Sequence, residues 1–92
     1  MIRRFSHRGL ERFFIRSDHR GIPAQHMQRL TRMLDRLEAA TRPQDMDLPG
    51  FRFHPLKGKR RGTFAVSVSA NWRLTFGFDG PDAIHVNLED YH

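Results

Sequence analysis

The last three residues of the sequence carry side chains that transfer protons. Asp90, Tyr91 and His92 supply a carboxylic acid, a phenol and an imidazole in consecutive positions, and all three types act as acids or bases in active sites. They follow a segment with the alternating pattern of a strand. Because a chain end without such support is more often frayed, these residues are a candidate catalytic group only if other polar residues converge on the same place.

Two polar residues lie inside segments in which apolar and polar residues alternate. By this alternation, His54 and Arg73 both point away from the apolar face. Imidazole, with a pKa near 6.5, accepts or donates a proton at neutral pH, and a guanidinium group binds phosphate with two hydrogen bonds. Simpler interpretations are that His54 is a surface residue and that Arg73 is ion-paired with Glu89 or Asp90.

The charge of the sequence is typical of a protein that binds nucleic acid. The net charge is +6, and fourteen of the sixteen basic residues are arginine. Residues 52–73 contain six basic residues and no acidic one, whereas the last fourteen residues contain four acidic residues and no basic one. A positive segment beside a carboxylate-bearing segment suits a site that binds phosphate and moves protons. Membrane surfaces and acidic proteins also attract basic domains.

Several other chemistries have little support in the sequence. Cysteine is absent, which excludes disulfides, thiolate metal sites and a thiol nucleophile. The six histidines have no metal-ligand spacing, and neither a glycine-rich phosphate loop nor a GxSxG elbow is present. We therefore predict no metal and no cofactor. A small secreted domain would usually need disulfides, so we expect a cytoplasmic protein. No signal peptide and no apolar run of roughly 20 residues is evident in the sequence.

The apolar spacing predicts two helices followed by strands. A first helix is expected over residues 7–16 with Ser6 as its N-cap, and a second from about Pro23 to Ala40. After a loop at 41–50 the period changes to two, which predicts strands over 51–54, 64–69, 72–78 and 84–88 with Ile84, Val86 and Leu88 on the apolar face. We predict one α+β domain, residues 1–92, with two helices on one face of a mainly antiparallel, twisted sheet of about four strands.

The faces of these elements suggest where a ligand binds. The uncovered sheet face combines long basic residues with small ones, which leaves a concave surface: Arg52, His54, Ala65, Ser67, Arg73, Thr75 and Gly77. Arg8, Arg12 and Arg16 recur at i, i+4 on one face of the first helix. That face is either solvated or a contact surface for acidic groups or phosphate.

Three motifs, in this order and at these spacings, resemble one toxin family. They are Phe53-His54-Pro55-Leu56-Lys57-Gly58, Asn71-Trp72-Arg73-Leu74-Thr75-Phe76 and Leu88-Glu89-Asp90-Tyr91-His92. Together with Ile2, Phe5 and Gly9-Leu10-Glu11 they resemble the HigB toxins, the "plasmid maintenance killer" branch of the RelE/ParE toxin superfamily. The resemblance spans nearly the whole chain and is weakest at residues 41–50.

The resemblance implies a RelE-like microbial ribonuclease fold and a toxin that cleaves messenger RNA in the ribosomal A site. It implies a cognate antitoxin with a helix-turn-helix domain (HigA-like). Its site residues map onto His54, Lys57, Arg73, Asp90, Tyr91 and His92. The ribosome would be met by Arg8, Arg12, Arg16, Lys59, Arg60 and Arg61. Lys57 enters through the resemblance alone, because its basic loop otherwise fits a solvated surface.

The chemistry that we expect is attack of a 2′-hydroxyl group on the adjacent phosphate. His92 and His54 are the candidates for general base and general acid, with His92 preferred as base, and Asp90 either orients an imidazole or is itself the base. Lys57 and Arg73 would stabilise the charge on the phosphate, and Tyr91 would position the nucleotide. Two alternatives stay open: a ParE-like toxin that acts on DNA gyrase without cleaving RNA, and a basic RNA-binding module.

Overall fold

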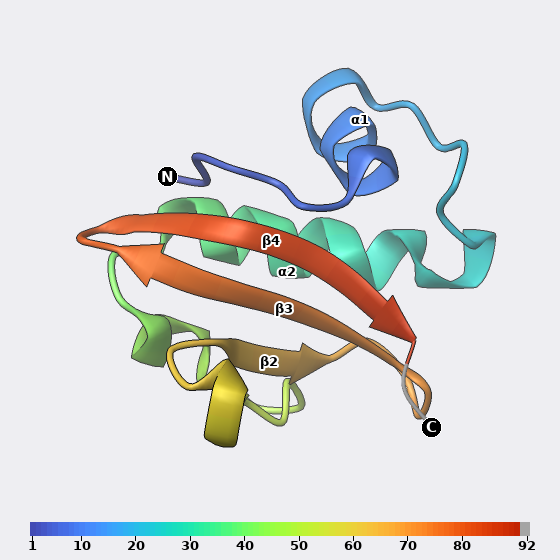
Figure 1. Cartoon of the computed structure of the whole chain (residues 1–92). Coiled ribbons are helices and arrows are strands. Elements are labelled where there is room, and N and C mark those ends of the chain that lie inside the picture. Colours follow the sequence, from blue (N-terminus) through green and yellow to red (C-terminus); the bar gives the residue numbers. More distant parts are fainter. Residues whose placement is uncertain (91–92) are drawn as a thin grey trace.

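The N-terminal half of the chain is helical and the C-terminal half forms a sheet in the computed structural model, which describes residues 1–90 (Figure 1). The helices are α1 (Arg8–Arg16) and α2 (Met27–Ala39), and short 3₁₀ turns are η1 (Ala24–His26), η2 (Pro43–Met46) and η3 (Gly58–Arg60). The strands are β1 (His54–Pro55), β2 (Phe64–Ser67), β3 (Trp72–Asp79) and β4 (Asp82–Asp90). Within residues 1–90, every helix is too short or too polar to cross a membrane.

The sheet is antiparallel and its strands lie in sequence order, β1-β2-β3-β4. The N-terminal segment runs beside β4 and forms parallel bridges from Ile2 to Ala83 and from Phe5 to Val86. The first residues of the chain therefore cover the edge of β4 that would otherwise be open to pairing.

One face of the sheet is covered by α2, which crosses behind the strands in Figure 1. The helix buries the stripe that its spacing predicts, because Leu30, Met33, Leu34 and Leu37 are all 0% exposed. This stripe packs in one cluster with Val66, Leu74, Phe76, Val86 and Leu88 of the strands. The predicted α+β architecture, with helices on one face of a four-stranded antiparallel sheet, is confirmed.

The N-cap of α1 differs from the sequence prediction. The N-cap is His7 rather than Ser6, and its Nδ1 accepts a hydrogen bond of 3.0 Å from the backbone N–H of Leu10. An imidazole nitrogen reaches this donor as a serine hydroxyl would. Gly9 makes room for the ring, since a Cβ there would lie 3.0 Å from His7 Cε1. At the other end Ser17 adopts a left-handed conformation, φ 54°, and its N–H bonds back to the carbonyls of Arg12 and Phe13.

The segment before β1 is not the strand that the alternation predicts. Left-handed conformations at Gly50 (φ 83°) and Arg52 (φ 54°) make it turn, and pairing begins only at His54. Arg29 of α2 fixes this turn, because its guanidinium group donates to the carbonyls of Gly50 and Ser67. Phe51 is consequently drawn into the core, where it is 1% exposed.

A β-bulge in β4 reverses the predicted orientation of Ile84. The register shifts between Thr75 and Gly77 of β3, and His85 has a left-handed φ of 54°. One extra residue in β4 moves the preceding side chains to the other face. Ile84 pairs with Gly77 and Ala83 takes the core position, with 0% exposure. The alternation through Val86 and Leu88 holds, and at Ile84 it is wrong.

A candidate active site on the open sheet face

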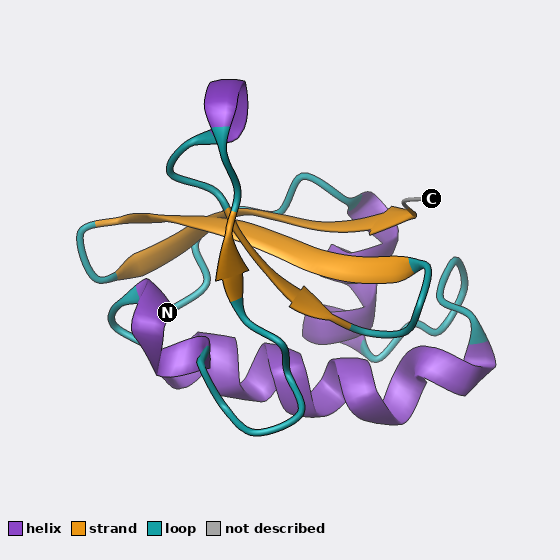
Figure 2. Cartoon of the chain, turned by 90° about the horizontal axis from the view of Figure 1, so that it is seen from below, coloured by secondary structure: helices purple, strands orange, loops and turns teal. Residues whose placement is uncertain are grey.

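One face of the sheet is turned away from α2 (Figure 2), and the strand register places polar residues of the strands on this face. Residues directly opposite in an antiparallel ladder share a face. One row runs from His54 through Ala65 and Thr75 to Asn87, and the next from Ser67 through Arg73 to Glu89. The predicted common face of His54 and Arg73 is therefore present, and the strand spacing puts their Cα atoms roughly 12 Å apart.

A concave pocket of about 570 Å³ opens on this face beside β1 and β2. Its walls are formed by Arg52, His54, Ser67, Ser69 and Ala70. The serine and alanine side chains are short, so that the longer arginine and imidazole groups stand around a hollow. This agrees with the predicted concavity, although Ser69 and Ala70 belong to the β2–β3 turn and were not predicted to take part.

His54 is held in one orientation by the turn that precedes β1. Its Nδ1 lies 3.0 Å from the carbonyl oxygen of Arg52. Since a carbonyl oxygen only accepts, Nδ1 carries the hydrogen in this bond. In the neutral ring Nε2 is then the unprotonated nitrogen, and in the charged ring it is a donor. His54 is half-buried, and Nε2 is the ring nitrogen that this hydrogen bond does not occupy.

Glu89 is at the centre of the polar network on this face. Its carboxylate accepts from Arg60 at 2.9 Å and from Arg73 at 3.3 Å, and Thr75 Oγ1 donates to it at 2.9 Å. The hydrogen bonds of Arg60 are the main cause that lowers the pKa of Glu89 from 4.5 to about 2, against the opposing effect of burial. The carboxylate is therefore charged at neutral pH.

The sequence indicated only part of this network. An ion pair between Arg73 and Glu89 was one of the interpretations of Arg73, and the structure contains it. Arg60 was predicted to contact the ribosome from a solvated loop, yet its guanidinium group reaches across to Glu89. In the sequence, the pair could be suspected only because Arg73 and Glu89 lie in neighbouring predicted strands. Whether they meet depends on the register between those strands.

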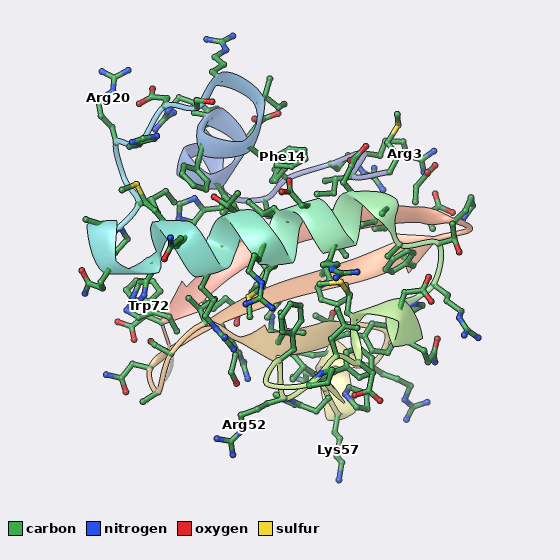
Figure 3. All side chains as sticks on the ribbon, turned by 180° about the vertical axis from the view of Figure 1, so that it is seen from behind. Arg3, Phe14, Arg20, Arg52, Lys57 and Trp72 are labelled. Carbon is green, nitrogen blue, oxygen red and sulfur yellow. The ribbon has the colours of Figure 1, made fainter. Side chains whose placement is uncertain are left out.

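The other predicted site residues lie in different environments. Lys57 follows β1 and extends from the molecule at the base of η3 (Figure 3). Asp90 ends β4 opposite Trp72, so its strand position alternates with that of Glu89 and it does not share the face of Arg73. Tyr91 and His92 lie outside the described residues.

The arginines of α1 form a separate basic surface. Arg8, Arg12 and Arg16 are exposed and, with Glu11 and Ile15, line a shallow depression. Nε of Arg12 also lies 3.8 Å from Oδ2 of Asp18. Lys59 and Arg61 of the β1–β2 connection are exposed as predicted.

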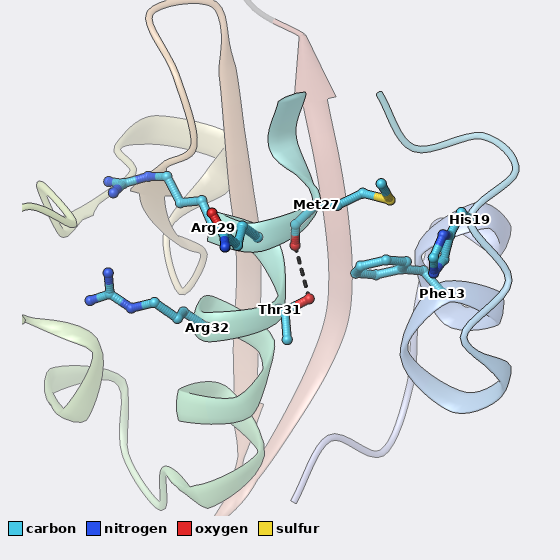
Figure 4. A pocket seen from close by; sticks show the side chains of 7 residues that line it. Phe13, His19, Met27, Arg29, Thr31 and Arg32 are labelled. Carbon is cyan, nitrogen blue, oxygen red and sulfur yellow. Dashed lines mark hydrogen bonds between the residues drawn. The ribbon is translucent and has the colours of Figure 1, made fainter. Parts of the chain in front are cut away.

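A second cavity, of about 740 Å³, lies between α1 and α2 (Figure 4). Phe13, His19 and Met27 form one wall of it. Arg29 and Arg32 extend to the other side of α2, where their guanidinium groups stand 5.8 and 6.0 Å from the ring of Phe51. None of the predicted catalytic residues lines this cavity between α1 and α2. Among residues 1–90, no group of three or more His, Asp or Glu residues could hold a metal ion.

Comparison with known proteins gives a consistent relationship. Residues 3–92 match the family described as the RelE-like toxin of the type II toxin-antitoxin system HigB. The chain is 40% identical over 92 residues to "Endoribonuclease HigB" of Proteus vulgaris, covering all of both chains. It is 32% identical over 89 residues to "Toxin HigB-1" of Vibrio cholerae, covering 95% of this chain and 94% of the relative.

The fold also has a counterpart among solved structures. The "YoeB/ParE toxin from Agrobacterium tumefaciens" superposes with a TM-score of 0.60 and 16% identity, over 100% of this chain and 99% of that chain. At this identity the likeness concerns the fold alone. The match over residues 3–92, together with 40% identity over the full length of the Proteus vulgaris relative, shows that the chain belongs to the HigB family of RelE-like toxins of type II toxin-antitoxin systems.

Proposed function

We propose that the chain is an endoribonuclease that cleaves messenger RNA in the A site of the ribosome and thereby arrests translation. The observation that carries the proposal is the placement of His54 beside a pocket with Arg52, on the same sheet face as Arg73. An imidazole can serve as the acid or base of RNA cleavage, and guanidinium groups can stabilise the charge that develops on the phosphate. The name of the Proteus vulgaris relative, "Endoribonuclease HigB", supports the same chemistry.

The reaction is an internal transfer of the phosphoryl group. A base removes the proton of the 2′-hydroxyl group, and the 2′-oxygen forms a bond to the adjacent phosphorus. The bond from phosphorus to the 5′-oxygen of the next nucleotide breaks, and an acid protonates that oxygen. The products are a 2′,3′-cyclic phosphate and a free 5′-hydroxyl group.

The roles of the side chains follow from this scheme. His54 acts through Nε2, because Nδ1 is occupied by Arg52 O, and His92 is the second imidazole, preferred as base. Arg73 stabilises the negative charge that gathers on the phosphate, and Lys57 contributes a second cation. Asp90, the last residue of β4, orients an imidazole or accepts the proton itself. Tyr91 positions the nucleotide by stacking or hydrogen bonding.

Membership of a type II toxin-antitoxin family implies an antitoxin partner. The finer proposal is an antitoxin with a helix-turn-helix domain, encoded next to the toxin, and action in the cytoplasm, where ribosomes and messenger RNA meet. Dependence on the ribosome fits a site with few catalytic groups, because a surface that holds RNA in a reactive geometry supplies much of the rate. The exposed groups Arg8, Arg16, Lys59 and Arg61 are the proposed contacts with ribosomal RNA.

The test uses ribosomes programmed with an end-labelled messenger RNA. The purified chain is expected to cut within the A-site codon and to leave a 5′-hydroxyl end. His54→Ala should lower the cleavage rate by at least about 100-fold, the usual contribution of a general acid or base. Removal of His92 should have a similar effect. His19→Ala, which removes an exposed imidazole from the other cavity, is the matched control and should cut at the normal rate.

Expression without an antitoxin should arrest growth, and Arg73→Ala should relieve the arrest. Uncut messenger RNA together with inhibited supercoiling by DNA gyrase would overturn the nuclease and identify a ParE-like toxin. Normal cutting by His54→Ala would remove His54 from the mechanism.

A further inference from the structure

One carboxylate links two arginines that come from different parts of the chain. Glu89 of β4 forms salt bridges with Arg73 of the neighbouring strand β3 and with Arg60 of η3. The bond with Arg60 uses both of its terminal nitrogens, one on each carboxylate oxygen. Arg73 is more weakly engaged, through one nitrogen at 3.3 Å. Glu89 therefore ties η3 to β3, and Arg60 makes the shorter of its two arginine contacts.

The contact with Arg60 fixes the position of the β1–β2 connection. This connection stands on the side of the sheet opposite α2 (Figure 2). Inside it, the N–H of Arg60 bonds to the carbonyl of Lys57 at 3.3 Å, which closes η3. Because the ion pair with Glu89 holds Arg60 against the sheet, it also positions the backbone of Lys57 relative to Arg73. Thr75 completes the arrangement by donating to the second oxygen of Glu89.

The charges explain why the carboxylate is needed. Arg60 and Arg73 carry like charges and share one anion, so they would repel each other without it. Glu89 and Arg73 are 19% and 16% exposed at their side chains, which limits screening by water. A bidentate pair between arginine and a carboxylate also fixes the direction of the guanidinium plane.

We propose that Glu89 is a positioning residue of the nuclease site, which holds Arg73 and the loop that carries Lys57 in the geometry that the scissile phosphate requires. This role rests on the proposed function. Glu89 acts through the two cations and not on the substrate. The cost of losing it should therefore appear in the rate of the chemical step and only weakly in the binding of the ribosome.

The experiment measures cleavage on programmed ribosomes under single-turnover conditions, with separate values for the maximal rate and for the half-saturating toxin concentration. Glu89→Gln keeps the shape of the side chain and removes its charge. We expect the maximal rate to fall about 10- to 100-fold, as for a small misplacement of catalytic groups, with less than about a threefold change in half-saturation. Arg60→Gln lies on an exposed turn and should reproduce this loss without a defect in folding.

A double-mutant cycle tests whether Glu89 acts through Arg60. The double variant should cut about as fast as either single variant, because both remove the same interaction. Arg42→Gln, which breaks an exposed pair with Asp45 at 3.1 Å, is the charge-matched control for Arg60→Gln and should change neither parameter.

The outcomes are distinct. Unchanged maximal rates in Glu89→Gln, whatever its melting temperature, would show a role in stability alone and overturn the positioning role. Additive losses in the double variant would show that Glu89 and Arg60 act separately, which also contradicts it. If the unmodified chain does not cut messenger RNA on ribosomes, the proposed function fails and this role fails with it.

Discussion

Glu89 shows how one residue acquires its properties from neighbours that are distant in sequence. Arg60 is 29 residues away and Arg73 is 16 residues away. Their hydrogen bonds to the carboxylate hold its pKa at about 2, below the usual 4.5. Protonation of the Glu89 carboxylate in acid therefore affects both the stability of the fold and the candidate site.

The pKa of Glu89 predicts loss of stability in acid. A carboxylate with a folded pKa below its unfolded pKa contributes stability that is fully present above about 4.5 and is lost as the pH falls towards about 2. The free energy of unfolding, measured by urea denaturation between these values, should fall more steeply for the unmodified chain than for Glu89→Gln. Equal slopes for the two proteins would contradict the assignment.

At the scale of elements, α1 depends on an unusual cap. Nδ1 of His7 accepts from the N–H of Leu10, so it must be unprotonated there. Burial of the ring is the main cause that lowers the pKa of His7 below 6.5, and the charge of Arg12 acts in the same direction. The first turn of α1 is therefore coupled to the protonation of one imidazole.

This cap predicts that α1 is less stable in mild acid. A histidine whose folded pKa is lowered contributes stability above its unfolded pKa of 6.5, and this contribution is lost as the pH falls below that value. His7→Asn keeps a capping oxygen without a titrating group. Between about pH 8 and about pH 5 the free energy of unfolding should fall more for the unmodified chain than for His7→Asn. The other histidines are common to both proteins and cancel, so an equal fall would refute the coupling.

The elements also show what the sequence can predict and where it fails. The stripe of Leu30, Met33, Leu34 and Leu37 follows from helical spacing alone, because a covered face needs apolar residues at that period. The orientation of Ile84 does not, since it depends on a bulge formed where β4 meets β3. The common face of His54 and Arg73 follows from alternation. The network around Glu89 does not follow from alternation, because its contact with Arg73 depends on strand register and its contact with Arg60 depends on the position of a loop. The predicted role of Lys57 rests on the family resemblance alone.

At the scale of the whole molecule, basic groups lie at two opposite ends. Figure 1 shows α1 beyond the edge of β4 and η3 near the opposite edge of the sheet, and both segments carry basic residues. The molecule is small, with Cα extents of 31 × 28 × 25 Å. Because α1 and η3 lie at different edges of the sheet, it presents basic side chains to solvent on more than one side. This distribution suits a site enclosed by RNA.

The distribution predicts which arginines matter for binding to the ribosome. Arg8→Gln and Arg16→Gln should each weaken binding and reduce the slope of log affinity against log salt by about 1, as expected for loss of one phosphate contact. Arg3→Gln is the control, because Arg3 is already paired with Asp79 at 2.6 Å, and it should have a smaller effect. The measurement is binding to ribosomes over a series of salt concentrations. Equal slopes in all variants would rule out α1 as a contact surface.

The pairing of residues 2–5 with β4 has a consequence for synthesis of the protein. This segment is made before β4 and has no ladder partner until β4 is available, since its bridges go to Ala83 and Val86. The same strand supplies Glu89, which joins Arg60 and Arg73. During synthesis the network of Glu89, Arg60 and Arg73 therefore cannot assemble before β4 has been made, so the candidate site is among the last parts of the described fold to form.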